Sequence, residues 1–165
     1  MKANSVGFYF EEYEEGAVLQ HAPTKTIFES DNNLFSLLTM NHHPVHTNLQ
    51  YAQTTQHGQI LVVGTLVFSL VVGMTVNDIS GKAVANLDYE KIEHVKPVFL
   101  GDTLHAETEI LRVRESRSKK DRGVLYVETR GFNQHDELVI RFRRHVLVKK
   151  RPEDAAGQQE GKESK

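Results

Sequence analysis

The second half of the chain alternates between apolar and polar residues with a period of two. From Leu138 onward, one set of alternate positions is mostly apolar and the other is mostly polar or charged. This pattern is typical of antiparallel strands that bury one face and leave the other in water. It predicts four strands, over residues 84–94, 104–113, 123–132 and 138–149, with the basic run 112–120 as a solvated hairpin loop.

Two helices are predicted before these strands. Residues 60–76 are almost wholly apolar and uncharged, and their length of about 17 residues touches the lower limit for a membrane span. Gly64, Gly73 and several hydroxyl residues interrupt the run, and the amphipathic strands need an apolar element to cover, so we expect a helix buried in the protein. A shorter helix is expected over residues 32–39, capped by Ser30 or Asp31. Its expected apolar face consists of Leu34, Phe35, Leu37 and Leu38.

The predicted order is a short strand, a short helix, a turn, a long buried helix and four strands. This order indicates an α+β fold in which one antiparallel sheet wraps around one helix. The 165 residues are 39% hydrophobic and 25% charged, which fits one soluble domain over residues 1–151. From residue 152 to residue 165 the composition is polar, and we expect a disordered tail there.

Charge and composition exclude several function classes. The formal net charge of -2 gives no electrostatic reason to expect nucleic acid or an anionic membrane as a partner. The absence of cysteine excludes disulfides, thiolate catalysis and cysteine-ligated metals. The first 13 residues lack a basic region followed by an apolar stretch, so no secretory signal is expected and the cytoplasm is the default location.

A tight cluster of polar residues occupies positions 40–48, between the two predicted helices. Pro44 fixes its own φ and pushes the preceding residue toward extended geometry, so that Asn41 and His46 can converge across a bend. A histidine can take and return a proton near neutral pH. The cluster therefore predicts a site for acid–base chemistry around His46.

Gly64 lies near the predicted start of the buried helix, where unpaired backbone N–H groups and the helix dipole would attract a developing oxyanion. A glycine there would let a carbonyl approach closely. Val63 and Thr65 flank it and, together with His43, are the expected substrate contacts. A base near an oxyanion-stabilising helix start is what enolate chemistry on a thioester requires.

Other interpretations of the same residues stay open at this point. Gly64 could simply ease helix packing, and His42, His43 and His46 could together bind a metal. The metal interpretation is weak, because the chain has no His-Glu-x-x-His pattern, no cysteine and no carboxylate beside the cluster. We therefore expect no metal and no resident cofactor.

The segment Asn41-His42-His43-Pro44-Val45-His46 resembles the Asp-x-Asn-Pro-[Ile/Leu/Val]-His motif of the MaoC-like family, the (R)-specific enoyl-CoA hydratases with a hot-dog fold. Residues 51–58 follow at the family's spacing, Gly64 falls at the position of its oxyanion glycine, and residues 97–104 resemble its Pro-Val-x-x-Gly-Asp-Thr-Leu segment. The resemblance covers about residues 10 to 150. It implies a hydratase or dehydratase acting on α,β-unsaturated acyl-CoA, with His46 as the catalytic imidazole and CoA present only as part of the substrate.

Two motif positions differ from the family pattern. Asn41 replaces the motif aspartate and can orient water but cannot accept its proton, and His43 replaces the motif asparagine. Three possibilities follow: His46 acts alone while Asn41 positions the water; His43 supplies the missing acid or base; or hydration is lost and the chain binds or hydrolyses acyl thioesters. We favour the first, because residues 36–41 resemble a branch of the family in which asparagine is usual.

That branch is linked to branched C5-dicarboxylic acyl-CoAs such as itaconyl-CoA or mesaconyl-CoA. The family likeness also implies at least a homodimer, because a single hot-dog domain leaves a sheet edge exposed. A non-catalytic acyl-thioester-binding module is the alternative class of function.

Overall fold

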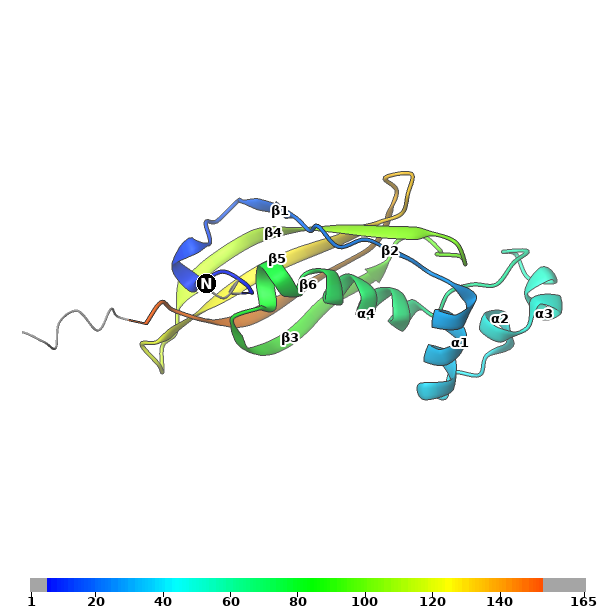
Figure 1. Ribbon diagram of the computed structural model, residues 1–165, viewed down its shortest axis with the longest axis horizontal. Coiled ribbons are helices and arrows are strands. Elements are labelled where there is room, and N and C mark those ends of the chain that lie inside the picture. Colours follow the sequence, from blue (N-terminus) through cyan, green and yellow to red (C-terminus); the bar gives the residue numbers. More distant parts are fainter. Residues whose placement is uncertain (1–5, 153–165) are drawn as a thin grey trace, which may run out of the picture.

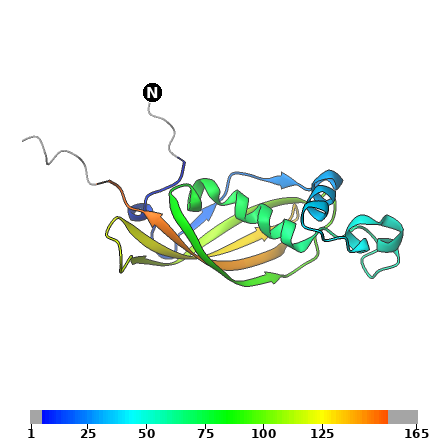
Figure 2. The ribbon, with the colours of Figure 1, turned by 90° about the horizontal axis from the view of Figure 1, so that it is seen from below.

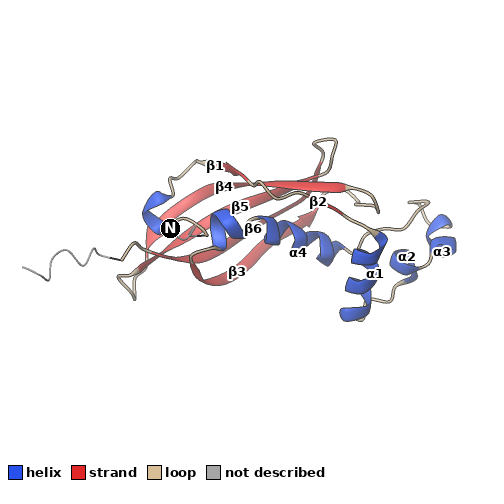
Figure 3. Ribbon diagram, viewed as in Figure 1, coloured by secondary structure: helices blue, strands red, loops and turns tan. Residues whose placement is uncertain are grey.

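Four long antiparallel strands form the body of the fold (Figures 1 and 3). The structure is a computed structural model that describes residues 6–152, so the tail expected from residue 152 lies outside the described residues except for Pro152. The elements in chain order are the 3-10 turn η1 (Phe10–Glu12), strands β1 (Val18–Gln20) and β2 (Lys25–Thr26), helices α1 (Glu29–Leu38), α2 (Pro44–Thr47), α3 (Leu49–Gln53) and α4 (Gly64–Met74), the π-helical turn η2 (Val76–Ser80), and strands β3 (Ala83–His94), β4 (Thr103–Glu115), β5 (Arg122–Phe132) and β6 (Leu138–Lys149).

The strand order in the sheet is β1-β4-β5-β6-β3, with β2 paired to β4 beside this path. The four long strands match the predicted ones to within two residues at each end. The basic run was expected to be a loop throughout, and this is wrong for its first part, because Val113 and Arg114 pair with Leu125 and Val124 and extend β4. Only residues 116–121 form the connection.

Helix α4 lies across one face of the sheet (Figures 1 and 2). Its residues Leu66, Val67 and Val71 share one apolar core with Ile140 and Phe142 of β6. The side of α4 that carries Thr65, Ser69 and Gly73, spaced four residues apart, is exposed. The sequence predicts a helix that is buried on all sides, and this is wrong within this chain, because one side of α4 is exposed. In the part of the chain that the structure covers, no helix is long and apolar enough to cross a membrane.

Helix α4 is shorter than the apolar run 60–76. Before it, Leu61 forms an isolated bridge with Phe99, and the Val62 N–H donates to the Val98 carbonyl at 2.9 Å. These contacts hold residues 61 and 62 extended against the chain that leads into β4. The first helical residue is consequently Gly64, which places the predicted oxyanion glycine in the first turn.

Helix α1 buries the side opposite to the one that the sequence predicts. It begins at Glu29 with Phe28 as N-cap, and Asp31 accepts the Phe28 N–H at 2.9 Å from inside the first turn, so the predicted cap at Ser30 or Asp31 is wrong. Its buried residues are polar, namely Asn32 and Ser36. The predicted apolar face is largely in solvent, since Leu34, Leu37 and Leu38 are 58%, 59% and 73% exposed.

An arginine is buried at the end of α4. Arg144 of β6 is fully buried and donates to Thr75 Oγ1 at 2.7 Å and to Asn86 Oδ1 at 3.1 Å. Burial lowers the pKa of its guanidinium from the ordinary value. Thr75 is the C-cap of α4, so the cation lies where the helix dipole is negative.

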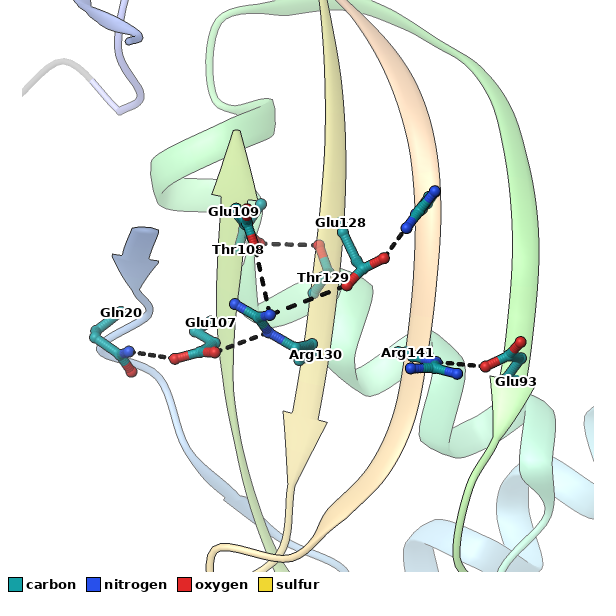
Figure 4. A network of polar contacts seen from close by, with 10 residues as sticks. Gln20, Glu93, Glu107, Thr108, Glu109, Glu128, Thr129, Arg130 and Arg141 are labelled. Carbon is teal, nitrogen blue, oxygen red and sulfur yellow. Dashed lines mark hydrogen bonds and ion pairs between the residues drawn. The ribbon is translucent and has the colours of Figure 1, made fainter. Parts of the chain in front are cut away.

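The opposite face of the sheet is charged. Arg130 of β5 lies between Glu107 and Glu109 of β4 at 2.8 and 3.3 Å (Figure 4). Arg143 of β6 pairs with Glu128 at 2.6 Å. Opposite charges on neighbouring strands stabilise the pairing modestly and keep this face compatible with water.

Candidate active site

Helices α1, α2 and α3 lie at one end of the sheet, and α2 and α3 extend beyond it (Figures 1 and 2). Pro44 is the first residue of α2, and His43 is its N-cap, with Nδ1 accepting the Val45 N–H at 3.2 Å. A proline at the first helical position loses no hydrogen bond and has φ already suited to the helix. The Pro-Val-His sequence thus folds into a short turn that fixes the direction of His46.

One hydrogen bond sets the tautomer of the neutral His46 ring. His46 Nδ1 lies 2.7 Å from the Leu61 carbonyl oxygen. A carbonyl oxygen can only accept, so Nδ1 carries the proton and donates it. In the neutral imidazole the lone pair is therefore on Nε2, which makes His46 a base at that atom.

Asn32 joins the His46 turn to the start of α4. Its side chain is 1% exposed. Its Nδ2 donates to the His46 carbonyl and its Oδ1 accepts the Val63 N–H, both at 2.9 Å. Sequence reasoning missed this residue, although two polar residues four positions apart in a predicted helix, Asn32 and Ser36, were a signal that the buried stripe is polar.

Gly64 is the first of the 11 residues of α4. Its backbone N–H has no protein acceptor within residues 6–152. A Cβ atom at this position would lie 3.0 Å from His94 Cε1 and 3.1 Å from His94 Nε2. A side chain here would thus press on His94, and glycine leaves the N–H accessible at the positive end of the helix dipole.

His46 and Gly64 line the same cavity, of about 270 Å³. The lining residues are His46, His57, Leu61, Val62, Gly64, Val67, His94, Val95, Lys96, Pro97 and Val98. The titratable side chains in this list are three imidazoles and one ammonium group, without a carboxylate. His46 and Gly64 thus line one cavity that has no carboxylate in its lining.

The second sequence motif builds a wall of this cavity. Asp102 Oδ2 accepts the Phe99 N–H at 2.8 Å, and Gly101 has a φ of 90°, a conformation that favours glycine. The Gly-Asp pair thus makes the turn that follows Pro97 and Val98. In this structure the motif residues shape the site, and the Asp102 side chain does not line it.

The other predicted site residues lie around the cavity. Asn41 follows α1, with its backbone N–H bonded to the Ser36 carbonyl at 3.0 Å, and the His43 ring centroid is 6.1 Å from that of His46. Val63 is buried, and Thr65 is exposed on α4. The structure brings His46 and Gly64 together but places these four outside the cavity lining. Within the described part, no group of three His, Cys, Asp or Glu side chains is arranged to hold a metal.

Residues 11–131 match the family model of the MaoC-like domain. The chain belongs to the MaoC-like domain family. A mesaconyl-CoA hydratase of Cereibacter sphaeroides is 38% identical over 151 residues, which cover 92% of this chain and 43% of the relative. A beta-methylmalyl-CoA dehydratase of Chloroflexus aurantiacus is 35% identical over 149 residues, covering 90% of this chain and 42% of the relative.

Solved structures support the fold of this MaoC-like domain. A putative MaoC domain protein dehydratase from Chloroflexus aurantiacus superposes with a TM-score of 0.86 at 34% identity, over 94% of this chain and 44% of that chain. A conserved hypothetical protein from Mycobacterium tuberculosis, which has a double hot-dog fold, gives a TM-score of 0.81 at 21% identity, over 89% of this chain and 46% of that chain. The predicted α+β hot-dog fold is confirmed, and the chain spans less than half the length of these relatives.

Proposed function

We propose that this MaoC-like domain adds water to, or removes it from, the double bond of an α,β-unsaturated acyl-CoA thioester. The observation that carries the proposal is one cavity that holds both the His46 ring, with its base at Nε2, and the free N–H of Gly64. CoA is part of the substrate, and no step requires another cofactor. The resemblance to hydratases and dehydratases supports the same reaction class.

The proposed reaction uses His46 twice. A water molecule gives a proton to His46 Nε2 while its oxygen bonds to the β-carbon. The electrons of the double bond move toward the thioester, and its oxygen becomes an enolate that Gly64 N–H stabilises. The imidazolium then returns the proton to the α-carbon, so one water is added and the enzyme is restored.

Asn41 keeps the role given to it by the sequence, namely to orient the water by its amide oxygen. Asn41 itself is not among the residues that line the cavity. Changing Asn41 to Asp separates two cases. If the native protein has hydratase activity and the variant keeps it or lowers it, Asn41 is an adapted catalytic residue. If hydratase activity appears only in the variant, the native chain binds thioesters or catalyses another reaction.

The substrate that we propose is a branched dicarboxylyl-CoA of the mesaconyl or itaconyl type. Two observations support this choice: the named relatives are a mesaconyl-CoA hydratase and a beta-methylmalyl-CoA dehydratase, and the cavity lining has three imidazoles and no carboxylate. A negatively charged acyl group would meet no like charge there. Thioester hydrolysis on the same site is the second candidate.

We further propose a homodimer in the cytoplasm as the working form. The edge strand β3 is exposed along most of its length, and α4 also has an exposed side at Thr65, Ser69 and Gly73. Exposed apolar residues also gather on α1 and nearby, including Leu38 and Met40. Such surfaces are typical of contacts between copies, and a second copy would supply what the second unit supplies in a double hot-dog fold.

The test is incubation of the purified protein with crotonyl-, mesaconyl- and itaconyl-CoA, followed by mass spectrometry. Gain of water supports hydration, and release of free CoA supports thioester hydrolysis instead. A His46→Asn variant should lose the water-adding activity. No mass change with any substrate, or unchanged activity in that variant, refutes the proposal.

A further inference from the structure

His94 is a residue of the cavity that the family motif does not include. It is the last residue of β3, and its ring lies against Gly64, as the 3.0 and 3.1 Å approaches to a Cβ at that position show. The side chain is exposed on the cavity side, and neither ring nitrogen has a hydrogen-bond partner among the residues described. An imidazole with two unused nitrogens thus stands beside the oxyanion donor.

The position of the ring limits what it can touch. Gly64 and His94 line the same cavity, so a thioester whose oxygen accepts the Gly64 N–H has its first acyl carbons in the space that the His94 ring lines. In a mesaconyl-type thioester the free carboxylate is attached to the β-carbon, only two carbons away from the thioester carbonyl. The carboxylate of such a substrate therefore comes within reach of the His94 nitrogens.

We propose that His94 binds the free carboxylate of the substrate and so selects dicarboxylyl thioesters over monocarboxylic ones. This inference rests on the proposed function for the choice of substrate, and it adds the residue that recognises it. A ring N–H donates to the carboxylate, and a charged partner makes this a strong hydrogen bond. The substrate supplies the negative charge that the cavity lining lacks.

Two other basic groups of the cavity are less suited to this role. The Lys96 ammonium is already paired with Glu137 at 2.6 Å, which reduces its net attraction for another carboxylate. The His57 ring packs edge-on to Phe99, with ring centroids 6.0 Å apart. His94 is the group in direct contact with Gly64.

Binding of saturated analogues tests the inference without any turnover. Succinyl-CoA has a carboxylate on its β-carbon, and butyryl-CoA has a methyl group there. The variant His94→Phe keeps a flat ring beside Gly64. Calorimetry should show that it weakens the binding of succinyl-CoA by about 10- to 100-fold and the binding of butyryl-CoA by less than about threefold. His105→Phe is the control, since His105 points to the opposite face of the sheet from the buried Leu104 and Ala106.

The same split should appear in kcat/KM for mesaconyl-CoA against crotonyl-CoA. Equal weakening of both analogues, or none, overturns the role of His94. Loss of the succinyl-CoA preference in Lys96→Met but not in His94→Phe overturns it in favour of the lysine. If the wild-type protein hydrates neither substrate, the proposed function fails, and the calorimetric preference still decides the inference. Circular dichroism melting confirms that each variant is folded.

Discussion

Replacing Asn32 with leucine removes the link between the base and the oxyanion helix. Leucine has a similar size but cannot donate to the His46 carbonyl or accept from the Val63 N–H, the two bonds that Asn32 makes at 2.9 Å. The Val63 N–H is in a buried setting. A buried polar group that loses its partner costs about 1–3 kcal/mol, so the buried Val63 N–H and the part-buried His46 carbonyl together predict a loss of at most about 6 kcal/mol in the free energy of unfolding.

The assay is urea unfolding followed by far-ultraviolet circular dichroism. Asn33→Leu is the matched control, because Asn33 is the exposed neighbour on the same helix, and it should change the free energy of unfolding by less than about 0.5 kcal/mol. In the Asn32 variant kcat should also fall, since the relative position of His46 and Gly64 is no longer fixed. Equal midpoints for the two variants would refute the reasoning.

Three further predictions concern catalysis, packing and pH. His46→Asn should lower kcat by about 10²- to 10⁴-fold while His42→Asn, at an exposed neighbour, does not; a drop below tenfold in steady-state assays contradicts the base role. Arg144→Met should lower the free energy of unfolding by less than about 1 kcal/mol or raise it, because an apolar side chain replaces a buried cation that has no carboxylate partner among the described residues. A loss above about 3 kcal/mol in urea unfolding would count against this. The hydrogen bonds from Lys25 and the Phe28 N–H hold the pKa of Asp31 below its ordinary value, so its stabilisation is present above that ordinary value and is lost as the pH falls through the lowered pKa. Asp31→Asn should therefore have a lower melting temperature than the wild type at pH 7, and the difference should shrink at pH 3; an unchanged difference rules this out.

The strands, and the closeness of His46 to Gly64, were predictable because their signals are local. Alternation in residues 138–149 reports directly which face of β6 is buried. The motif spacing pointed to His46 and Gly64, and the structure places both at one cavity. These features depend on residues near one another in the sequence.

The features that sequence reasoning missed depend on contacts between distant segments. The Asn32 side of α1 is buried, and Asn32 forms hydrogen bonds there with His46 and Val63, which lie 14 and 31 positions later in the sequence. The leucines of α1 consequently lie on its exposed side in this chain. His94 reaches Gly64 because β3 pairs with β6 and returns to the start of α4. Neither contact follows from a periodic pattern.

The exposed side of α4 and the exposed leucines of α1 bear on how the stability of this chain depends on its concentration. If a second copy covers these surfaces, unfolding is coupled to dissociation, and the melting temperature rises with protein concentration. In a relative that contains two such units in one chain, the second unit is always present at a high effective concentration. Dilution should therefore lower the melting temperature of this protein and leave the melting temperature of a two-unit chain unchanged.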